Sequence, residues 1–350
     1  MLKYFLVIVV FGFMLISCGE KKEEPQKTLD ESNKYSFDST DLKTQGVDNS
    51  GKPFKLEYKF KKGDNVTYRL TTISDNSQTI TMDTTISTKV NQKIVYLLNV
   101  NIKDVDDEGT MEAEVKITSV KLDAIANGKV YAFEAGKDKD SASLEQYAEF
   151  QSLYNNAFSV RFNKLGEVLE VYKVDKISNK FLELRGALDT ISTSDKNLIT
   201  QNLTNSVLTP LITQVVRKTT DKEVYKDSTW QMQQKPVPLM VYQMNFTNIY
   251  KISSVEKIND DKIAVIDADI KFTYTGNPKV NQPNASYSFQ KPISTADGKI
   301  YFDVDKGLQM KAITKTRLEI SYSMEGMTPQ GKQKGSETNV ISNTNILEML

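Results

Sequence analysis

The sequence predicts a mainly β protein: an antiparallel open barrel or half-barrel with two or three helices inserted in the middle of the chain. Two observations predict this fold class. Apolar and polar residues alternate in many segments between Phe54 and Leu347, a period typical of strands with one buried face, and runs of Asp, Asn and Gly separate these segments. The region 176–218 instead carries an apolar stripe at helical spacing.

The first half of the chain is expected to form long hairpins. Thr and Ser fill many of the alternate positions in its early strands, which suits a sheet with one solvated face. A strand over 94–102 turns through 104–109 and returns over 111–117, and a slip in phase near Val120 indicates a bulge. The expected strands of this half are centred on 54–60, 66–70, 80–86, 94–102, 111–117, 130–133, 158–162 and 168–172.

The middle of the chain is expected to be helical. A short helical pattern spans 144–158, and the main helical block is 176–218. Pro210 should kink or split the helix that carries it, because proline removes a backbone N–H and clashes with the preceding turn. The stripe along this block either packs on the sheet or, as a sharper hypothesis, forms one wall of a cavity for an apolar ligand. The residues of that candidate wall are Leu203, Val207, Leu211 and Val215.

Strands are expected again from about Ser228 to the C-terminus, with a Gly-rich polar loop over 325–337. The hairpin at 248–272 has the same order of features as that at 94–119, and the tight turns at Gly166 and Gly307 also correspond. Long hairpins look alike by chance, so two arrangements stay open. They are a single β-rich domain over 53–350, or two β halves, 53–175 and 228–350, around the helical block.

The N-terminus has the features of an export signal. Lys3 precedes an uncharged, mostly apolar run over 4–17, which is short for a membrane-spanning helix because a span needs about 20 residues. The run ends in Leu15-Ile16-Ser17-Cys18, which resembles the lipobox of bacterial lipoproteins. The resemblance implies that residues 1–17 are a cleaved signal peptide and that Cys18 is acylated, which would anchor the protein to a membrane.

Residues 18–52 are expected to be the lipidated Cys and a flexible stalk, because they are polar and poor in aliphatic side chains. Gly19 follows the Cys, where an Asp would signal inner-membrane retention in enteric-type bacteria, so the segment resembles that of an outer-membrane lipoprotein. The charged cluster 20–24 resembles surface-export signals and equally fits a solvated spacer. The periplasmic face and the cell surface therefore both stay open.

Composition excludes several function classes. The chain has no His, which removes the commonest general base, the commonest zinc ligand and the Ser-His-Asp and Cys-His arrangements. The single Cys is the expected lipid-attachment residue, which removes thiol catalysis and thiolate metal sites. The chain has 45 Lys and Arg residues and 45 Asp and Glu residues, so it lacks the excess of positive charge that is typical of nucleic-acid-binding proteins. We expect no enzyme, no cofactor and no nucleic-acid partner.

Three candidate sites have ordinary structural explanations. Asp104, Asp106 and Glu108 look like the start of a calcium loop, but the position where an EF-hand needs Glu holds Val115, so a hairpin turn is expected. Trp230, the single Trp, is expected in the core. No two carboxylates stand out as a glycosidase pair.

Several segments together carry a family resemblance. They are LEYKFKKGDNVTYRLT (56–71), QTITMDTTIST (78–88), FSVRFNKLGEVLEVYKVDKI (158–177), YKDSTW (225–230) and GKIYFDVDKGLQMK (298–311). The pattern resembles a family of Gram-negative lipoproteins of unknown function, although that family more often has Gly before the acid of the fourth segment. The resemblance covers most of the mature chain and implies no activity. The order of elements also looks like the lipoprotein carrier fold, an open half-barrel with helices over its concave face.

The sequence therefore favours a membrane-anchored envelope lipoprotein that binds an apolar ligand or lipid without catalysis. The alternative is a structural or scaffold lipoprotein that binds an envelope protein. A carboxylate-based hydrolase is the least favoured of the three.

Overall fold

The computed structural model describes residues 34–46, 52–283, 285–328 and 331–350. The predicted signal peptide 1–17 and the predicted lipid-attachment residue Cys18 lie outside the described residues. The strands are β1 Gln45–Gly46, β2 Asn65–Thr81, β3 Thr85–Val105, β4 Met111–Ala126, β5 Lys129–Glu134, β6 Ala157–Phe162, β7 Val168–Tyr172, β8 Thr229–Gln233, β9 Val237–Leu239, β10 Tyr242–Ile258, β11 Asp261–Gly276, β12 Lys279–Gln282, β13 Ala285–Phe289, β14 Ile293–Asp303, β15 Leu308–Thr328 and β16 Gly331–Met349. The helices are α1 Ser141–Gln146, α2 Ala148–Leu153, α3 Asp175–Leu184, α4 Thr193–Leu203, the π-helix η1 Thr204–Leu208 and α5 Thr209–Val215.

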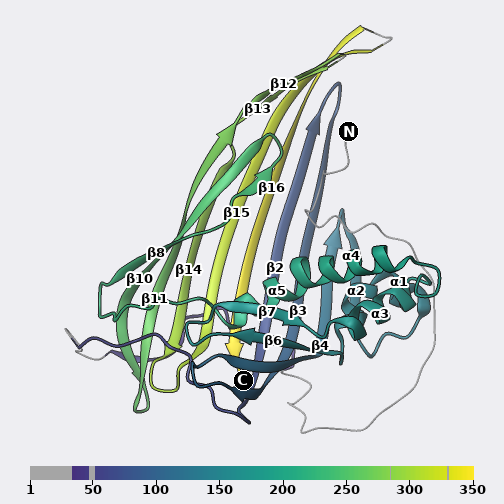
Figure 1. Cartoon of the computed structure of the whole chain (residues 1–350). Coiled ribbons are helices and arrows are strands. Elements are labelled where there is room, and N and C mark those ends of the chain that lie inside the picture. The colour runs from purple at the N-terminus through teal and green to yellow at the C-terminus, as the bar shows by residue number, and fades with distance from the viewer. Residues whose placement is uncertain (1–33, 47–51, 284, 329–330) are drawn as a thin grey trace.

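These strands form one sheet, drawn in Figure 1, in which each ladder between named strands is antiparallel. Its main path runs β1-β10-β11-β14-β15-β16-β2-β3-β4-β6-β7 and does not return to its first strand, so the sheet is not closed. The prediction of a mainly antiparallel β fold is confirmed.

The strands of the two halves of the chain meet where β16 pairs with β2, which makes the sheet continuous across them. The neighbour order β10-β11-β14-β15 in the second half repeats the order β3-β4-β6-β7 in the first. The β6–β7 turn at Gly166 and the β14–β15 turn at Gly307 thus occupy equivalent places, in agreement with the correspondence noted between their sequences.

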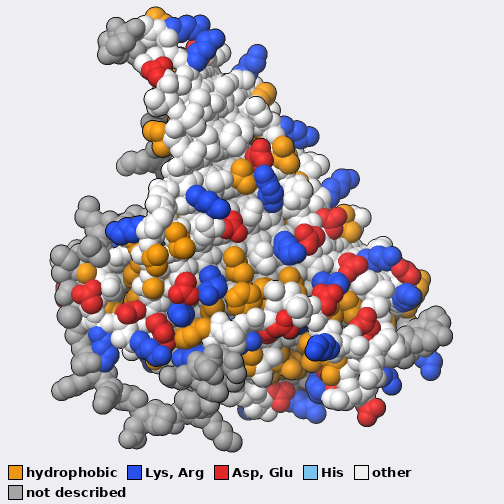
Figure 2. All heavy atoms as spheres, turned by 180° about the vertical axis from the view of Figure 1, so that it is seen from behind, with side chains coloured by type: hydrophobic (Ala, Val, Ile, Leu, Met, Phe, Trp, Pro, Cys, Tyr) orange, Lys and Arg blue, Asp and Glu red, His pale blue; other side chains and the backbone are white. Residues whose placement is uncertain are grey.

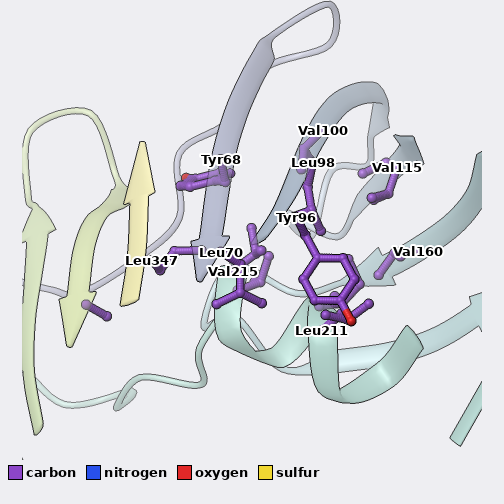
Figure 3. Packing of buried hydrophobic residues seen from close by; sticks show 14 of the residues in the cluster. Tyr68, Leu70, Tyr96, Leu98, Val100, Val115, Val160, Leu211, Val215 and Leu347 are labelled. Carbon is purple, nitrogen blue, oxygen red and sulfur yellow. The ribbon is translucent and has the colours of Figure 1, made fainter. Parts of the chain in front are cut away.

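One face of the sheet packs against the helices, and we call it the inner face; the opposite one is the outer face. Residues directly opposite in a ladder point to the same side, so the register places Leu70, Tyr96 and Leu347 together on the inner face. Figure 3 shows their side chains beside Leu211 and Val215 of α5. The core therefore lies between the helices and one end of the sheet, and the longest strands extend well beyond the helices (Figure 1).

Pro210 lies where the helical block changes its geometry, as the sequence predicts. The π-helix η1 directly precedes α5, and Pro210 occupies the first turn of α5. Proline cannot donate the regular helical hydrogen bond, and a π-helical turn is one way in which a helix accommodates that loss. The helical direction thus continues, and α5 keeps Leu211 and Val215 on the sheet.

Residues 54–60 alternate as predicted but do not form a strand of the sheet. Their alternate side chains are buried in the core. The backbone N–H of Tyr58 donates to the carbonyl of Lys164 (2.7 Å), and that of Lys59 donates to the carbonyl of Gly307 (3.0 Å). The first acceptor belongs to the β6–β7 turn and the second to the β14–β15 turn, so this segment ties the equivalent turns of the two halves together.

Residues 34–46 lie across the outer face, and we call them the N-terminal strap. Lys311 Nζ donates to Asp38 Oδ2 (3.0 Å) and Lys299 Nζ to Asp41 Oδ2 (2.5 Å), while β1 pairs with β10. The flexible stalk over 18–52 stays a prediction, but its residues 34–46 lie against the sheet, because Asp38 and Asp41 meet basic side chains of the outer face.

The far end of the sheet contains the long hairpins β2–β3 and β15–β16, and the short hairpin β12–β13 pairs with β15 there (Figure 1). Residues 325–337, predicted as a polar loop, instead contribute to the paired arms of β15 and β16 on either side of a short connection. Strand pairing here does not need apolar residues, since backbone hydrogen bonds continue from the core outward.

Candidate ligand-binding face

The four residues of the predicted cavity wall lie in the hydrophobic core. Leu203, Leu211 and Val215 are buried, and Val207 packs against the same cluster. Figure 3 shows Leu211 and Val215 pointing toward apolar side chains of the sheet, with which they form one hydrophobic cluster. The stripe thus packs on the sheet, and we place the candidate ligand surface elsewhere on the inner face.

Beyond the core, the inner face of the second-half strands carries many aromatic and aliphatic side chains, among polar ones such as Asn248, Thr314 and Thr316. The register places side chains from β10, β11, β13 and β15 on this face, and each of them is only partly buried. We call this surface the apolar face; its main residues are Met244, Phe246, Ile270, Phe272, Tyr274, Phe289 and Tyr322.

Aromatic rings pair across the strands of the apolar face. The centroids of Phe246 and Phe272 lie 6.5 Å apart, and those of Phe289 and Tyr322 lie 5.1 Å apart. The residues of β11 that point to the outer face behind these rings, such as Asp269 and Lys271, are charged or polar and exposed, whereas Ile263 and Val265 near the start of the strand are buried. In this region the sheet therefore carries aromatic side chains on one side and charged or polar ones on the other, and no helix of the described residues covers the aromatic side (Figure 1).

The neighbouring part of the inner face, on β16 and β2, is polar. Thr72 donates to Asn345 (2.9 Å), and Ser74 donates to Asn343 (2.6 Å). These cross-strand pairs satisfy one another's hydrogen bonds, so the polar part has little to offer an apolar molecule. The inner face is thus divided, and the apolar face has a polar border on its β16 side.

The outer face is different in character. Seen from the side opposite to Figure 1, basic and acidic side chains are interspersed over the surface (Figure 2). A hollow of about 310 Å³ on β2 to β5 is lined by residues that include Ile73, Lys93, Asp123 and Val130. Lys93 and Asp123 in this hollow form an ion pair of 3.2 Å, so it mixes charge with apolar surface and does not continue the apolar face.

Trp230 and Arg217 meet Tyr250 where the core ends and the apolar face begins. The rings of Trp230 and Tyr250 stack with centroids 5.2 Å apart and planes inclined by 20°. Burial lowers the pKa of the Arg217 guanidinium, and the hydroxyls of Tyr250 and Tyr58 beside it act in the opposite direction. Trp230 packs against the core, as predicted, but it also lies at this boundary.

Sequence reasoning did not single out Arg217. The signal available was its position directly after the apolar stripe of the helical block, where a basic side chain is ordinary. Its surroundings come from β10 and from residues 54–60, which are distant in the sequence, so only the folded chain reveals them.

The acidic clusters serve turns and ion pairs. Asp106 Oδ1 accepts hydrogen bonds from the backbone N–H of Glu108 (3.0 Å) and of Thr110 (2.7 Å), which is the predicted turn of the β3–β4 hairpin. Burial raises the pKa of Glu149, and Arg185 acts in the opposite direction. Within the described ranges, no group of acidic and Cys side chains has the arrangement of a metal site.

A family model described as a family of unknown function (DUF6263) matches residues 108–309, more than half of the chain. The protein therefore belongs to this family, and the expectation of a family without an assigned function is confirmed. No curated protein matches the chain. In the part of the chain that the structure describes, no helix has the length and apolar character needed to cross a membrane.

Solved structures show only distant likeness. A lipovitellin structure, titled for lipid–protein interactions, is 11% identical over 83% of this chain with a TM-score of 0.41, and this chain spans 25% of its length. OccK2 of Pseudomonas aeruginosa, solved with glucuronate, is 6% identical, with 80% of this chain and 96% of OccK2 covered and a TM-score of 0.19. An outer-membrane channel of Pseudomonas putida F1 is 8% identical, with 87% of this chain and 100% of the channel covered and a TM-score of 0.18. Such scores carry no argument about function.

Proposed function

We propose that this protein is a non-enzymatic envelope lipoprotein that binds an apolar ligand, or the acyl part of a lipid, on the apolar face. Cys18 would anchor it to the outer membrane through lipid, and the unclosed sheet with its helices would act as a half-barrel. The observation that carries the proposal is the aromatic and aliphatic surface formed by β10, β11, β13 and β15, which no helix in the described part of the chain covers.

Physical chemistry supports a ligand at this place. An uncovered apolar patch of this kind is unfavourable in water, and large ones commonly mark binding sites. Burial of such surface is worth roughly 25 cal/mol per Å². The ring pairs Phe246–Phe272 and Phe289–Tyr322 present flat faces and edges, against which a flexible hydrocarbon chain packs without needing directional bonds.

The proposal assigns no catalysis to the protein, and the contacts of four described acids are in keeping with it. Asp106 holds a turn, and Asp38 and Asp41 hold the strap. Burial raises the pKa of Glu149. The charged group that acts on this carboxyl is the Arg185 guanidinium and not a second carboxyl. A carboxylate hydrolase needs two acids with matched roles, and these residues do not supply them.

A face-matched pair of variants tests the proposal. The full-length chain is kept soluble in a tryptophan-free amphipathic polymer and titrated with decanol, with Trp230 emission as the signal. Phe272→Asp puts a charge on the apolar face and should weaken decanol binding about tenfold or more. Thr273→Asp puts the same charge on the adjacent outer-face position and should leave binding unchanged. Equal affinity in both variants, or no saturable binding by the unsubstituted chain, contradicts the proposal.

The scaffold alternative also has an observation in its favour. Large apolar side chains are exposed at the far hairpins: Met327 is 66% exposed, Ile86 is 63% and Met82 is 48%. Exposed apolar tips of this kind are a surface that a protein partner could cover. The protein should be extracted from its native membrane and its co-eluting molecules identified by mass spectrometry. A bound lipid supports the ligand proposal, and a stoichiometric protein supports the alternative.

A further inference from the structure

Arg217 is held in place by its backbone. Its N–H donates to the hydroxyl of Tyr58 (2.9 Å), and the same hydroxyl lies 3.3 Å from its carbonyl oxygen and donates to it. Tyr58 is itself buried in the core. Such fixing removes much of the freedom of the main chain that carries the guanidinium, so the charge has a defined place at the end of α5.

The guanidinium lacks a counter-charge among the described residues. None of their acidic groups lies within 4.0 Å of it, whereas the well-buried basic side chains Arg69 and Lys311 each have such a partner. Its Nη2 donates to Gln214 Oε1, and its Nε is buried without a hydrogen-bond partner. A partly buried cation in this condition is costly, and an anion that reached it would relieve that cost.

A second unpaired donor lies nearby. The indole Nε1 of Trp230 is buried and has no hydrogen-bond partner among the described residues. The Trp230 ring stacks on Tyr250, whose hydroxyl accepts a hydrogen bond from Asn248 Nδ2 (3.3 Å) and so keeps its own proton for another acceptor. The Tyr250 hydroxyl acts electrostatically on the Arg217 guanidinium, and the Arg217 backbone is bonded to the Tyr58 hydroxyl, so the guanidinium and the two neutral donors belong to one region of the inner face.

The donors lie at one end of the apolar face. From Tyr250, the inner-facing residues of β10 continue through Phe246 and Met244 to Tyr242, beside Phe272 and Tyr274 of β11. Eight residues of strand span about 26 Å. A polar end that attracts an anion is thus followed by an apolar track that is long enough for an extended acyl chain.

We propose that Arg217, together with Trp230 Nε1 and the Tyr250 hydroxyl, binds the carboxylate of a fatty acid whose chain lies along β10 and β11. This inference rests on the proposed function and names its ligand class. A carboxylate suits the site because its charge matches one guanidinium and its two oxygens accept bonds from a planar donor. The indole and the phenol supply neutral donors to the remaining lone pairs.

Trp230 makes the test direct, because it is the single Trp of the chain and its emission reports on this place. The full-length chain in a tryptophan-free amphipathic polymer is titrated with decanoate, with decanol and with acetate. Decanoate should bind about tenfold or more tightly than decanol, because its carboxylate adds a charge-assisted hydrogen bond to the guanidinium while the hydrocarbon chain is the same. Acetate should give no saturable change at the same concentrations.

Two variants separate the headgroup site from general charge. Arg217→Gln keeps a hydrogen-bonding side chain and should reduce decanoate affinity about tenfold or more, to that of decanol, while decanol affinity stays unchanged and shows that the variant is folded. Lys218→Gln removes a neighbouring charge that pairs with Glu167 and should change neither affinity.

The outcomes are distinguishable. If decanoate and decanol bind the unsubstituted chain equally, or if Arg217→Gln leaves decanoate affinity unchanged, the headgroup site is wrong while the proposed function stands. If neither ligand binds, by emission or by equilibrium dialysis, both are wrong. If acetate alone binds as tightly as decanoate, the site is an anion site without a fatty-acid role, and the inference is overturned.

Discussion

Lys311 and Asp38 lie 273 residues apart in sequence, and their charged groups are 3.0 Å apart in the structure. The Lys311 side chain is 4% exposed, whereas Asp38 is 56% exposed. Asp38 lies in the N-terminal strap, so a well-buried cation on β15 depends on a residue from a segment that the sequence describes as a stalk.

The strap should loosen when Asp38 is neutralised. Asp38→Asn leaves the Lys311 ammonium without its nearest partner, and we expect a loss of about 1 kcal/mol, since one side of the pair faces solvent. Hydrogen exchange over 34–46 should accelerate. Asp41→Asn is the control, because the Lys299 side chain that pairs with Asp41 is more exposed than Lys311 and loses less when its partner is neutralised. An equal or larger effect of Asp41→Asn would contradict this view of Lys311.

Acid should release the strap. Hydrogen bonds from Thr40 and the ammonium of Lys311 hold the pKa of Asp38 well below its usual range, and Lys299 does the same for Asp41. A carboxyl whose pKa is lower in the folded state stabilises it above the unfolded pKa of about 4, and the contribution is lost as pH falls below that value. The protection factors of the amides over 34–46, which are corrected for the intrinsic pH dependence of exchange, should be unchanged between pH 7 and 5 and lower at pH 3. Release between pH 8 and 6 would point to other groups.

The turn glycine Gly307 should resist substitution. Its φ is +65°, and a Cβ there would lie 2.5 Å from the backbone N of Lys59. Gly307→Ala should destabilise the protein by about 1–3 kcal/mol from the positive φ alone and by more from the clash. Gly186→Ala is the matched control, because its φ is +64° and nothing lies within 4 Å of its Cβ. Urea unfolding measures both, and equal losses would mean that the tie to Lys59 is unimportant.

Core and surface positions of the helical stripe should separate clearly. Leu211 is 8% exposed and packs on the sheet, whereas Leu198 of the same stripe is 55% exposed. Leu211→Ala should cost about 2–5 kcal/mol, and Leu198→Ala should stay within about 0.5 kcal/mol. Thermal or urea unfolding decides this. A stable Leu211→Ala variant with altered decanol binding would restore the predicted cavity wall.

The sequence by itself determined the fold class and much of the local structure. The period-two pattern predicted the sheet and the buried side of its strands, as at Leu70 and Tyr96, because alternation is a local property of an extended chain. Pro210 predicted a change of helical geometry for an equally local reason, the missing N–H.

Only the tertiary structure decided which segments meet. Residues 54–60 alternate like a strand, yet their backbone bonds go to two turns far along the chain. The polar composition of the strap predicts a flexible stalk, but its Asp38 and Asp41 form ion pairs with Lys311 and Lys299 of the sheet. Arg217 is distinguished by a buried Nε that has no hydrogen-bond partner among the described residues and by the electrostatic influence of Tyr250. Such features depend on long-range contacts, which the pattern of neighbouring residues does not encode.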